Sequence, residues 1–186
     1  MTDAAMPDPA ATDRGTAHRT AAPRPTADWA FLLWGDGAAG PAPRTSPAAR
    51  LTAAAHTARA LRDLSRHGWG AAQTRLRDLP VAPGAHRSLP EATALRVARR
   101  ELPRCQLVIR LAAPNALCLA RSFGLAVYLS AIGLPAETVI ARQRSSIGAR
   151  FAFHSWTELY GEVLNDVPVV QSGHTVLQRV GCAALH

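Results

Sequence analysis

The chain has 186 residues, 48% of them hydrophobic and 18% charged, a composition typical of one globular domain with its own core. Its formal net charge is +8, and all 21 basic residues are Arg. These arginines are scattered and aromatic residues make up only 5% of the chain, which argues against a nucleic-acid partner bound by base stacking. Because no apolar run reaches about 18 residues and the N-terminus lacks a signal-peptide core, we expect a cytoplasmic protein without a membrane span.

Composition divides the chain into a tail, a linker and one domain. Residues 1–27 are rich in Ala, Thr and Pro, so we expect a disordered tail. Residues 28–45 hold the apolar patch DWAFLLW and a Gly/Pro linker. Residues 46–186 then form a single domain, with a helical part at 46–102 and a catalytic part at 103–186.

Three helices are predicted in the helical part. The first begins at Ser46-Pro47 and stops at Gly68, and the second covers 69–79. The third starts at a capping box, Ser88 to Glu91, and ends at residue 102 before a proline. This part carries no catalytic constellation, so we expect it to act as scaffold and to help dock a partner.

A further helix is predicted in PNALCLARSFGLAVYLSAIG, with Cys118 close to its start. Asn115 is the expected N-cap, which makes Cys118 the third helical residue. A helix N-terminus and a nearby imidazole both lower a Cys pKa from about 8.5 and so favour the nucleophilic thiolate. Taken alone, Cys118 is better explained as a small buried apolar residue, as most free cysteines are, and only the strands downstream favour a nucleophile.

Two neighbouring strands, FAFHSWTEL and EVLND, carry a histidine and an aspartate. Alternation along the first strand puts His154, Trp156 and Glu158 on one face. A three-residue loop at 159–161, or a bulge, would set His154 opposite Asp166, with Cβ atoms roughly 5 Å apart. A two-residue turn would put the pair on opposite faces. We therefore predict a three-residue loop or a bulge, together with a Cys118-His154-Asp166 triad.

Two residues compete for roles in this triad. His174 follows a turn signal and is expected on a loop, between short strands at 167–170 and 175–180. Glu158 could replace Asp166 as the carboxylate, but it lies four residues along the strand from His154, roughly 13 Å away. We therefore prefer His154 as the base and Asp166 as its partner.

These residues resemble the transglutaminase-like leader peptidases of lasso peptide biosynthesis. The resemblance covers roughly residues 100–180 and rests on three motifs in order: Cys118 with Arg121-Ser122, HSWTE from His154, and Asn165-Asp166. It implies an α+β fold, papain- or transglutaminase-like, with the catalytic Cys at a helix N-terminus packed on a small antiparallel sheet. It also implies that Cys118 is the nucleophile, His154 the general base and acid, and Asp166 the residue that orients the imidazole.

The same resemblance implies the substrate and the partners. The substrate is a ribosomally made precursor peptide, whose leader is removed through an acyl-enzyme. The partners are a separate precursor-recognition protein and an ATP-dependent cyclase. The chain departs from papain-type enzymes in having no Gln shortly before Cys118, so the backbone N–H of Cys118 is the only oxyanion donor that we assign. We expect neither a cofactor nor a metal ion.

Two other functions stay open at the level of sequence. One is acyl transfer on the same triad, with an amine in place of water. The other is a non-catalytic peptide-binding partner in which the triad residues have no chemical role. Cys105 and Cys182 form no metal-ligand spacing and are expected to be packing or surface residues.

Overall fold

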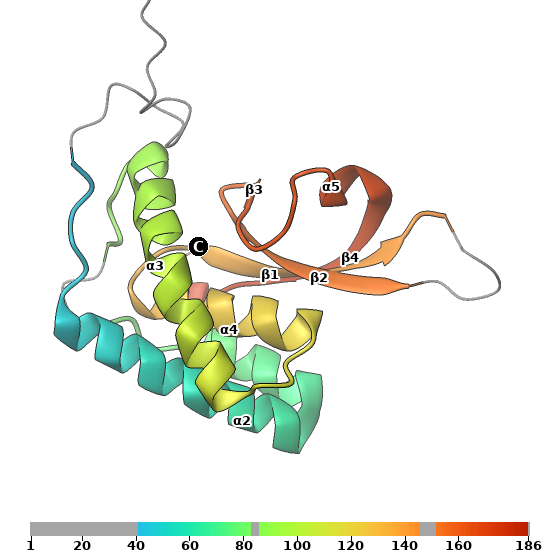
Figure 1. Cartoon of the computed structure of the whole chain (residues 1–186), viewed down its shortest axis with the longest axis horizontal. Helices are drawn as coiled ribbons and strands as arrows, with labels where there is room; N and C mark the ends of the chain where they lie inside the picture. Colours follow the sequence, from blue (N-terminus) through green and yellow to red (C-terminus); the bar gives the residue numbers. More distant parts are fainter. Residues whose placement is uncertain (1–40, 83–85, 146–151, 186) are drawn as a thin grey trace, which may run out of the picture.

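The computed structural model describes residues 41–82, 86–145 and 152–185. The tail at 1–27 and most of the predicted patch and linker at 28–45 lie outside this range. The described part combines helices with one small antiparallel sheet, so the predicted α+β class is confirmed (Figure 1). None of its helices combines the length and the apolar character needed to cross a membrane.

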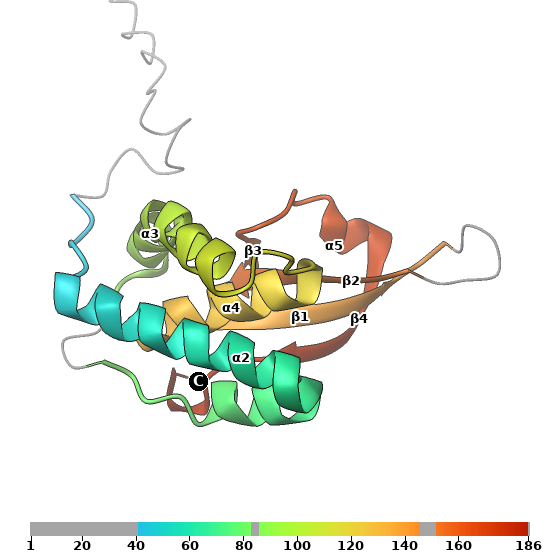
Figure 2. The ribbon, with the colours of Figure 1, turned by 60° about the horizontal axis from the view of Figure 1, so that its bottom comes forward.

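Helix α2, Pro47–Arg77, begins where the sequence predicts. The Ser46 hydroxyl caps it by accepting a hydrogen bond from the Ala49 N–H at 3.2 Å. Gly68, with φ 74° and ψ −174°, divides it into two segments, as the predicted stop requires. This backbone region is accessible almost only to glycine, so Gly68 sets the angle at which the second segment turns back towards the sheet (Figure 2).

Helix α3, Glu91–Ala112, is longer than predicted. The expected end at Leu102 is wrong, because the helix continues through Pro103 and its buried face extends to Cys105 and Ile109. One missing N–H costs less than exposing this apolar stripe. The capping box is also wrong, since Pro90 precedes the helix without a side-chain cap. The proposed division at 102/103 therefore falls inside one continuous helix.

Helix α4, Cys118–Ala131, lies between the other helices and the sheet (Figures 1 and 2). Its residues 122–131 are buried all round, because α2 and α3 cover one side and the sheet covers the other. The largest side chains of the main core gather around this helix; they include Leu76, Phe123, Leu125, Leu129 and Ile132.

The sheet has the order β3-β2-β1-β4, and all its neighbouring strands are antiparallel. The strands are β1 Ala136–Gln143, β2 Phe153–Leu159, β3 Glu162–Val163 and β4 His174–Val180. Sequence reasoning missed β1, although it is the central strand that pairs with both β2 and β4. The strand predicted at 167–170 is wrong: a turn and the short helix α5, Val170–Gly173, occupy this stretch.

Different elements pack on the two faces of the sheet. Helix α4 packs on one face, where the Ser122 and Ser155 hydroxyls hydrogen-bond at 2.6 Å. On the other face a smaller cluster joins Trp156 to Val139, Ala141 and Val170 of α5. The predicted alternation along β2 is confirmed, since Ser155 contacts α4 and Trp156 lies in the opposite cluster.

Candidate active site

Cys118 is the first residue of α4, not the third. The predicted cap is wrong because Pro114 and Asn115 form a turn instead, closed by a hydrogen bond from the Ala116 N–H to the Ala113 carbonyl at 3.0 Å. Proline and asparagine favour the central positions of such turns. Leu117 then precedes the helix, and its carbonyl accepts from the Arg121 N–H at 3.0 Å.

This placement puts the Cys118 thiol at the positive end of α4. The first N–H groups of a helix have no partner within it, and together with the aligned peptide dipoles they stabilise negative charge. The thiol is half-buried and Cys118 is not in a disulfide. Cys105 and Cys182 are fully buried, and burial raises the pKa of the Cys105 thiol. Among the cysteines, Cys118 is therefore the one placed for chemistry.

His154 and Asp166 are in direct contact. His154 Nε2 and Asp166 Oδ2 are 2.5 Å apart, and the Val167 N–H donates to the other carboxylate oxygen at 2.7 Å. Burial would raise the pKa of Asp166, but the hydrogen bonds from His154 and Val167, with the nearby charge of His174, lower it. The carboxylate therefore stays ionised and holds Nε2, which leaves Nδ1 as the nitrogen free to exchange a proton.

The route to this contact differs from the prediction. The hairpin has a two-residue turn, in which Tyr160 (φ 51°) and Gly161 (φ 81°) are both left-handed and Leu159 pairs with Glu162. The predicted three-residue loop is therefore wrong. A regular ladder in this register would place Asp166 on the face of the sheet opposite to that of His154.

The ladder stops after Val163, and an irregular segment restores the contact. The Leu164 N–H donates to the Thr157 carbonyl at 3.0 Å. The Thr157 N–H then donates to the Asn165 side-chain Oδ1 at 2.7 Å, where a continuing strand would offer a backbone carbonyl. Because a side chain takes that place, the backbone is displaced and the Asp166 carboxylate reaches His154.

Two ties hold the start of α4 against β2 close to His154. The Ser122 hydroxyl, one turn after Cys118, bonds that of Ser155, and the Thr157 hydroxyl donates to the Ser122 carbonyl at 2.9 Å. The His154 side chain itself lies on the other face, beside Trp156, and β3 pairs only with the far end of β2, at Glu158 and Leu159. The contact between Cys118 Sγ and His154 that acyl-enzyme chemistry requires stays a prediction.

Two buried side chains of β2, Trp156 and Glu158, lie on the same face of the strand as the His154 imidazole. The Trp156 ring lies 6.1 Å from the His154 ring, between centroids, and its Nε1–H donates to Glu158 at 2.6 Å. Glu158 is fully buried and also accepts from Gln171 and Arg179. Burial would raise the pKa of Glu158, but these hydrogen bonds lower it. As expected, Glu158 does not replace Asp166; it fixes Trp156 instead.

His174 is closer to the site than the sequence suggested. It is the first residue of β4, not a loop residue, and its ring lies 5.6 Å from that of His154 and 5.8 Å from that of Trp156. Its Nδ1–H donates to the Val170 carbonyl at 2.9 Å. Its charge adds to that of His154 in lowering the Asp166 pKa, so His174 belongs to the electrostatic surroundings of the site.

A comparison with protein-family models identifies the superfamily of this chain. Residues 45–179 match the model of the transglutaminase-like superfamily, which is most of the chain. The protein therefore belongs to the transglutaminase-like superfamily, a group that includes cysteine peptidases and acyltransferases. Neither the curated proteins nor the solved structures contain a significant match to this chain.

Proposed function

We propose that the protein is a cysteine peptidase that removes the leader from a ribosomally made lasso precursor peptide. The observation that carries the proposal is the His154–Asp166 contact within a transglutaminase-like domain whose Cys118 begins a helix. The motifs around these residues, which resemble those of lasso leader peptidases, support the choice of substrate. A precursor-recognition protein and an ATP-dependent cyclase are the proposed partners.

The proposed reaction has two stages. His154 Nδ1 takes the thiol proton, and the Cys118 thiolate attacks the scissile carbonyl carbon, forming a C–S bond. The C–N bond then breaks, and the imidazolium gives its proton to the leaving amine, which becomes the N-terminus of the core peptide. In the second stage His154 takes a proton from water, the hydroxide attacks the thioester, and the C–S bond breaks to give a leader with a C-terminal carboxylic acid, which ionises in solution. The imidazolium returns its proton to the Cys118 thiolate.

Mass spectrometry of the cognate precursor tests this proposal directly. We expect cleavage by the wild type, with and without the recognition partner compared side by side, and its loss in Cys118→Ala. Cys182→Ala is the matched control, since its thiol is buried away from the site and donates to the Leu79 carbonyl. Cleavage that survives in Cys118→Ala would refute the nucleophile. A product carrying an added amine in place of water would identify an acyltransferase.

Alkylation kinetics test the pairing of Cys118 with His154. Selective labelling of Cys118 by iodoacetamide is expected from exposure alone, because Cys105 and Cys182 are buried. The informative variant is His154→Ala, which should slow labelling near pH 6 and move the pH profile of the rate upward if the imidazole stabilises the thiolate. A profile that does not change would show that Cys118 and His154 do not interact, and would favour the non-catalytic peptide-binding role.

A further inference from the structure

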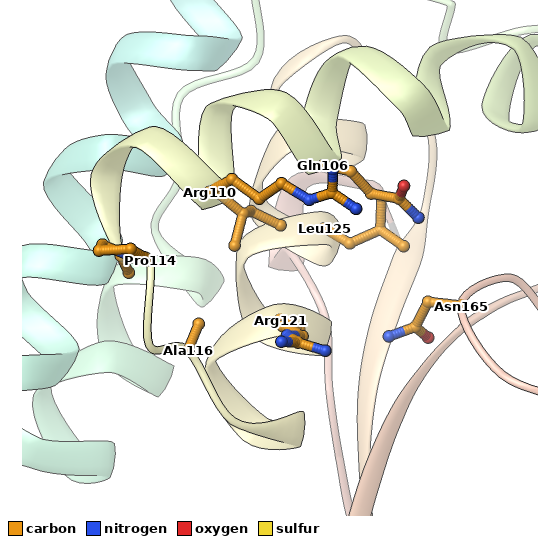
Figure 3. A pocket seen from close by; sticks show the side chains of 9 residues that line it. Gln106, Arg110, Pro114, Ala116, Arg121, Leu125 and Asn165 are labelled. Atoms are coloured by element: carbon orange, nitrogen blue, oxygen red, sulfur yellow. The ribbon is translucent and has the colours of Figure 1, made fainter.

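A small pocket with a mixed polar and apolar lining lies beside the start of α4. Its volume is about 200 Å³, below the roughly 300–1,000 Å³ of typical small-molecule sites, so it suits one side chain more than a cofactor. Helix α3 contributes Gln106 and Arg110 to its wall, and Arg121 of α4 and Asn165 lie across from them (Figure 3). Ile109 and Leu125 are the main apolar side chains that line it.

The pocket adjoins the candidate catalytic residues through two segments. Cys118 and Leu125 are seven residues apart on α4, which puts them on the same helix face, and Arg121 lies about one turn from Cys118. Asn165 directly precedes Asp166 in the irregular segment after β3. A peptide held across Cys118 would therefore pass the mouth of this pocket.

Hydrogen-bond donors predominate among the polar groups that line the pocket, although the Gln106 amide can also accept. The Asn165 Oδ1 already accepts from the Thr157 N–H, so its amide NH₂ is the end that remains for a ligand. Arg110 and Arg121 each add a guanidinium, which can only donate. Three donors around one small hollow suit a group that only accepts, and a carboxylate is the acceptor that guanidinium binds best.

The charges of these two arginines are also unbalanced. Arg50, Arg75 and Arg179 each pair with a carboxylate of the protein. Within the described residues, neither Arg110 nor Arg121 has such a partner. Both residues are exposed, so solvent screens part of the repulsion between their charges, and an anion bound between them would remove the rest.

We infer that this pocket is a specificity subsite for an Asp or Glu side chain of the substrate peptide. The carboxylate lies between Arg110 and Arg121 and accepts a further hydrogen bond from the Asn165 amide, while the methylene groups contact Leu125. This inference rests on the proposed peptidase function, because it assumes that a peptide crosses Cys118.

Peptide binding to Cys118→Ala tests the subsite without requiring cleavage. The probes are fluorescent peptides that span the scissile region, capped at both ends, with Glu or Gln placed at each position in turn. Fluorescence anisotropy should reveal one position at which Glu binds at least about 10-fold more tightly than Gln, as expected for a charge-assisted bidentate contact. The preference should weaken as salt concentration rises.

Arginine variants in the same background locate the effect. Arg110→Met and Arg121→Met should each reduce the Glu preference, whereas Arg66→Met, an exposed arginine of α2 outside the pocket, should leave it unchanged. Arg110→Glu should turn the preference at that position towards Lys. Binding without any Glu preference, no binding at all, or a preference that persists in both pocket variants would overturn the subsite.

The two proposals fail separately in these experiments. Wild-type cleavage of the precursor without any Glu preference would remove the subsite and leave the peptidase. Glu-selective, arginine-dependent binding by a protein that cleaves no precursor would keep the subsite and remove the peptidase.

Discussion

Two glutamates, Glu101 on α3 and Glu158 on β2, are both fully buried and both bound by an arginine, yet their neighbours differ. The single Arg50 Nε–H is shared between the two Glu101 carboxylate oxygens at 3.2 and 3.1 Å, Nη2 donates at 2.8 Å, and the Tyr128 hydroxyl lies at 3.4 Å. This cluster joins α2, α3 and α4.

Glu158 is held on the opposite side of the sheet from α4. Its partners are Trp156, Gln171 and Arg179, and Trp156 flanks the His154 ring. Both carboxylates stay ionised, because their hydrogen bonds outweigh the burial that would raise the pKa of each. A buried glutamate bound by an arginine thus joins helices in one region, and in the other it supports a candidate catalytic base.

The largest expected effect separates the two regions by stability. Arg50→Ala leaves the Glu101 carboxylate buried with its main partner removed, so we expect the free energy of unfolding to fall by about 3–5 kcal/mol. Chemical denaturation measures this loss, with the exposed Arg66→Ala as control, expected within about 0.5 kcal/mol of wild type. Cleavage activity per folded molecule should not change. A loss of activity in fully folded Arg50→Ala would contradict the separation.

The second prediction compares isosteric changes at the two glutamates. Glu101→Gln and Glu158→Gln each replace a charge-assisted hydrogen bond, and each should cost about 1–3 kcal/mol of unfolding free energy. Only Glu158→Gln should also lower kcat/KM, by up to about 100-fold, because a displaced Trp156 lets the imidazole move.

Kinetics on the folded variants distinguish positioning from simple destabilisation. For Glu158→Gln the loss should lie in kcat, with KM little changed, because Glu158 does not line the pocket proposed to bind the substrate. Equal activity losses in both glutamine variants would show that the two clusters do not differ in function.

The sequence predicts the parts of this comparison that depend on local chemistry. Ser46 caps the first helical segment, Pro47 occupies its first position, and Gly68 ends it. Each of these residue types favours that position in a helix. The period of two along β2 predicts that His154, Trp156 and Glu158 share a face. The order of Cys118, His154 and Asp166 suffices to propose the triad.

The remaining features depend on contacts between segments that are distant along the chain. The central strand β1 is defined by its pairing with β2 and β4, and Pro103 is tolerated because burial of the α3 stripe continues past it. The loop sequence is compatible with a two-residue and with a three-residue turn, so it does not predict which one forms. Nor does it predict that the Asn165 side chain replaces a backbone acceptor of the ladder. The pocket combines residues of α3, α4 and the segment after β3, so no local sequence motif predicts it.

The smallest predicted effect concerns acid sensitivity at Asp166. Its pKa in the folded protein is lowered, burial being outweighed by the hydrogen bonds from His154 and Val167 and by the nearby charge of His174. A carboxylate whose folded pKa is lowered stabilises the fold above its unfolded pKa, about 3.9, and loses that contribution as the pH falls through the folded value. The effect should be modest, because the Asp166 side chain is 26% exposed.

Denaturation of the wild type and Asp166→Asn between pH 6 and pH 3 measures this contribution. The difference in unfolding free energy should stay constant down to about pH 5 and shrink below about pH 4, because asparagine does not titrate. Glu101→Gln should show its own acid-dependent difference, since the Glu101 pKa is also lowered, but without any change in the alkylation profile of Cys118. Parallel curves for wild type and Asp166→Asn would mean that the Asp166–His154 contact does not hold the carboxylate ionised in solution.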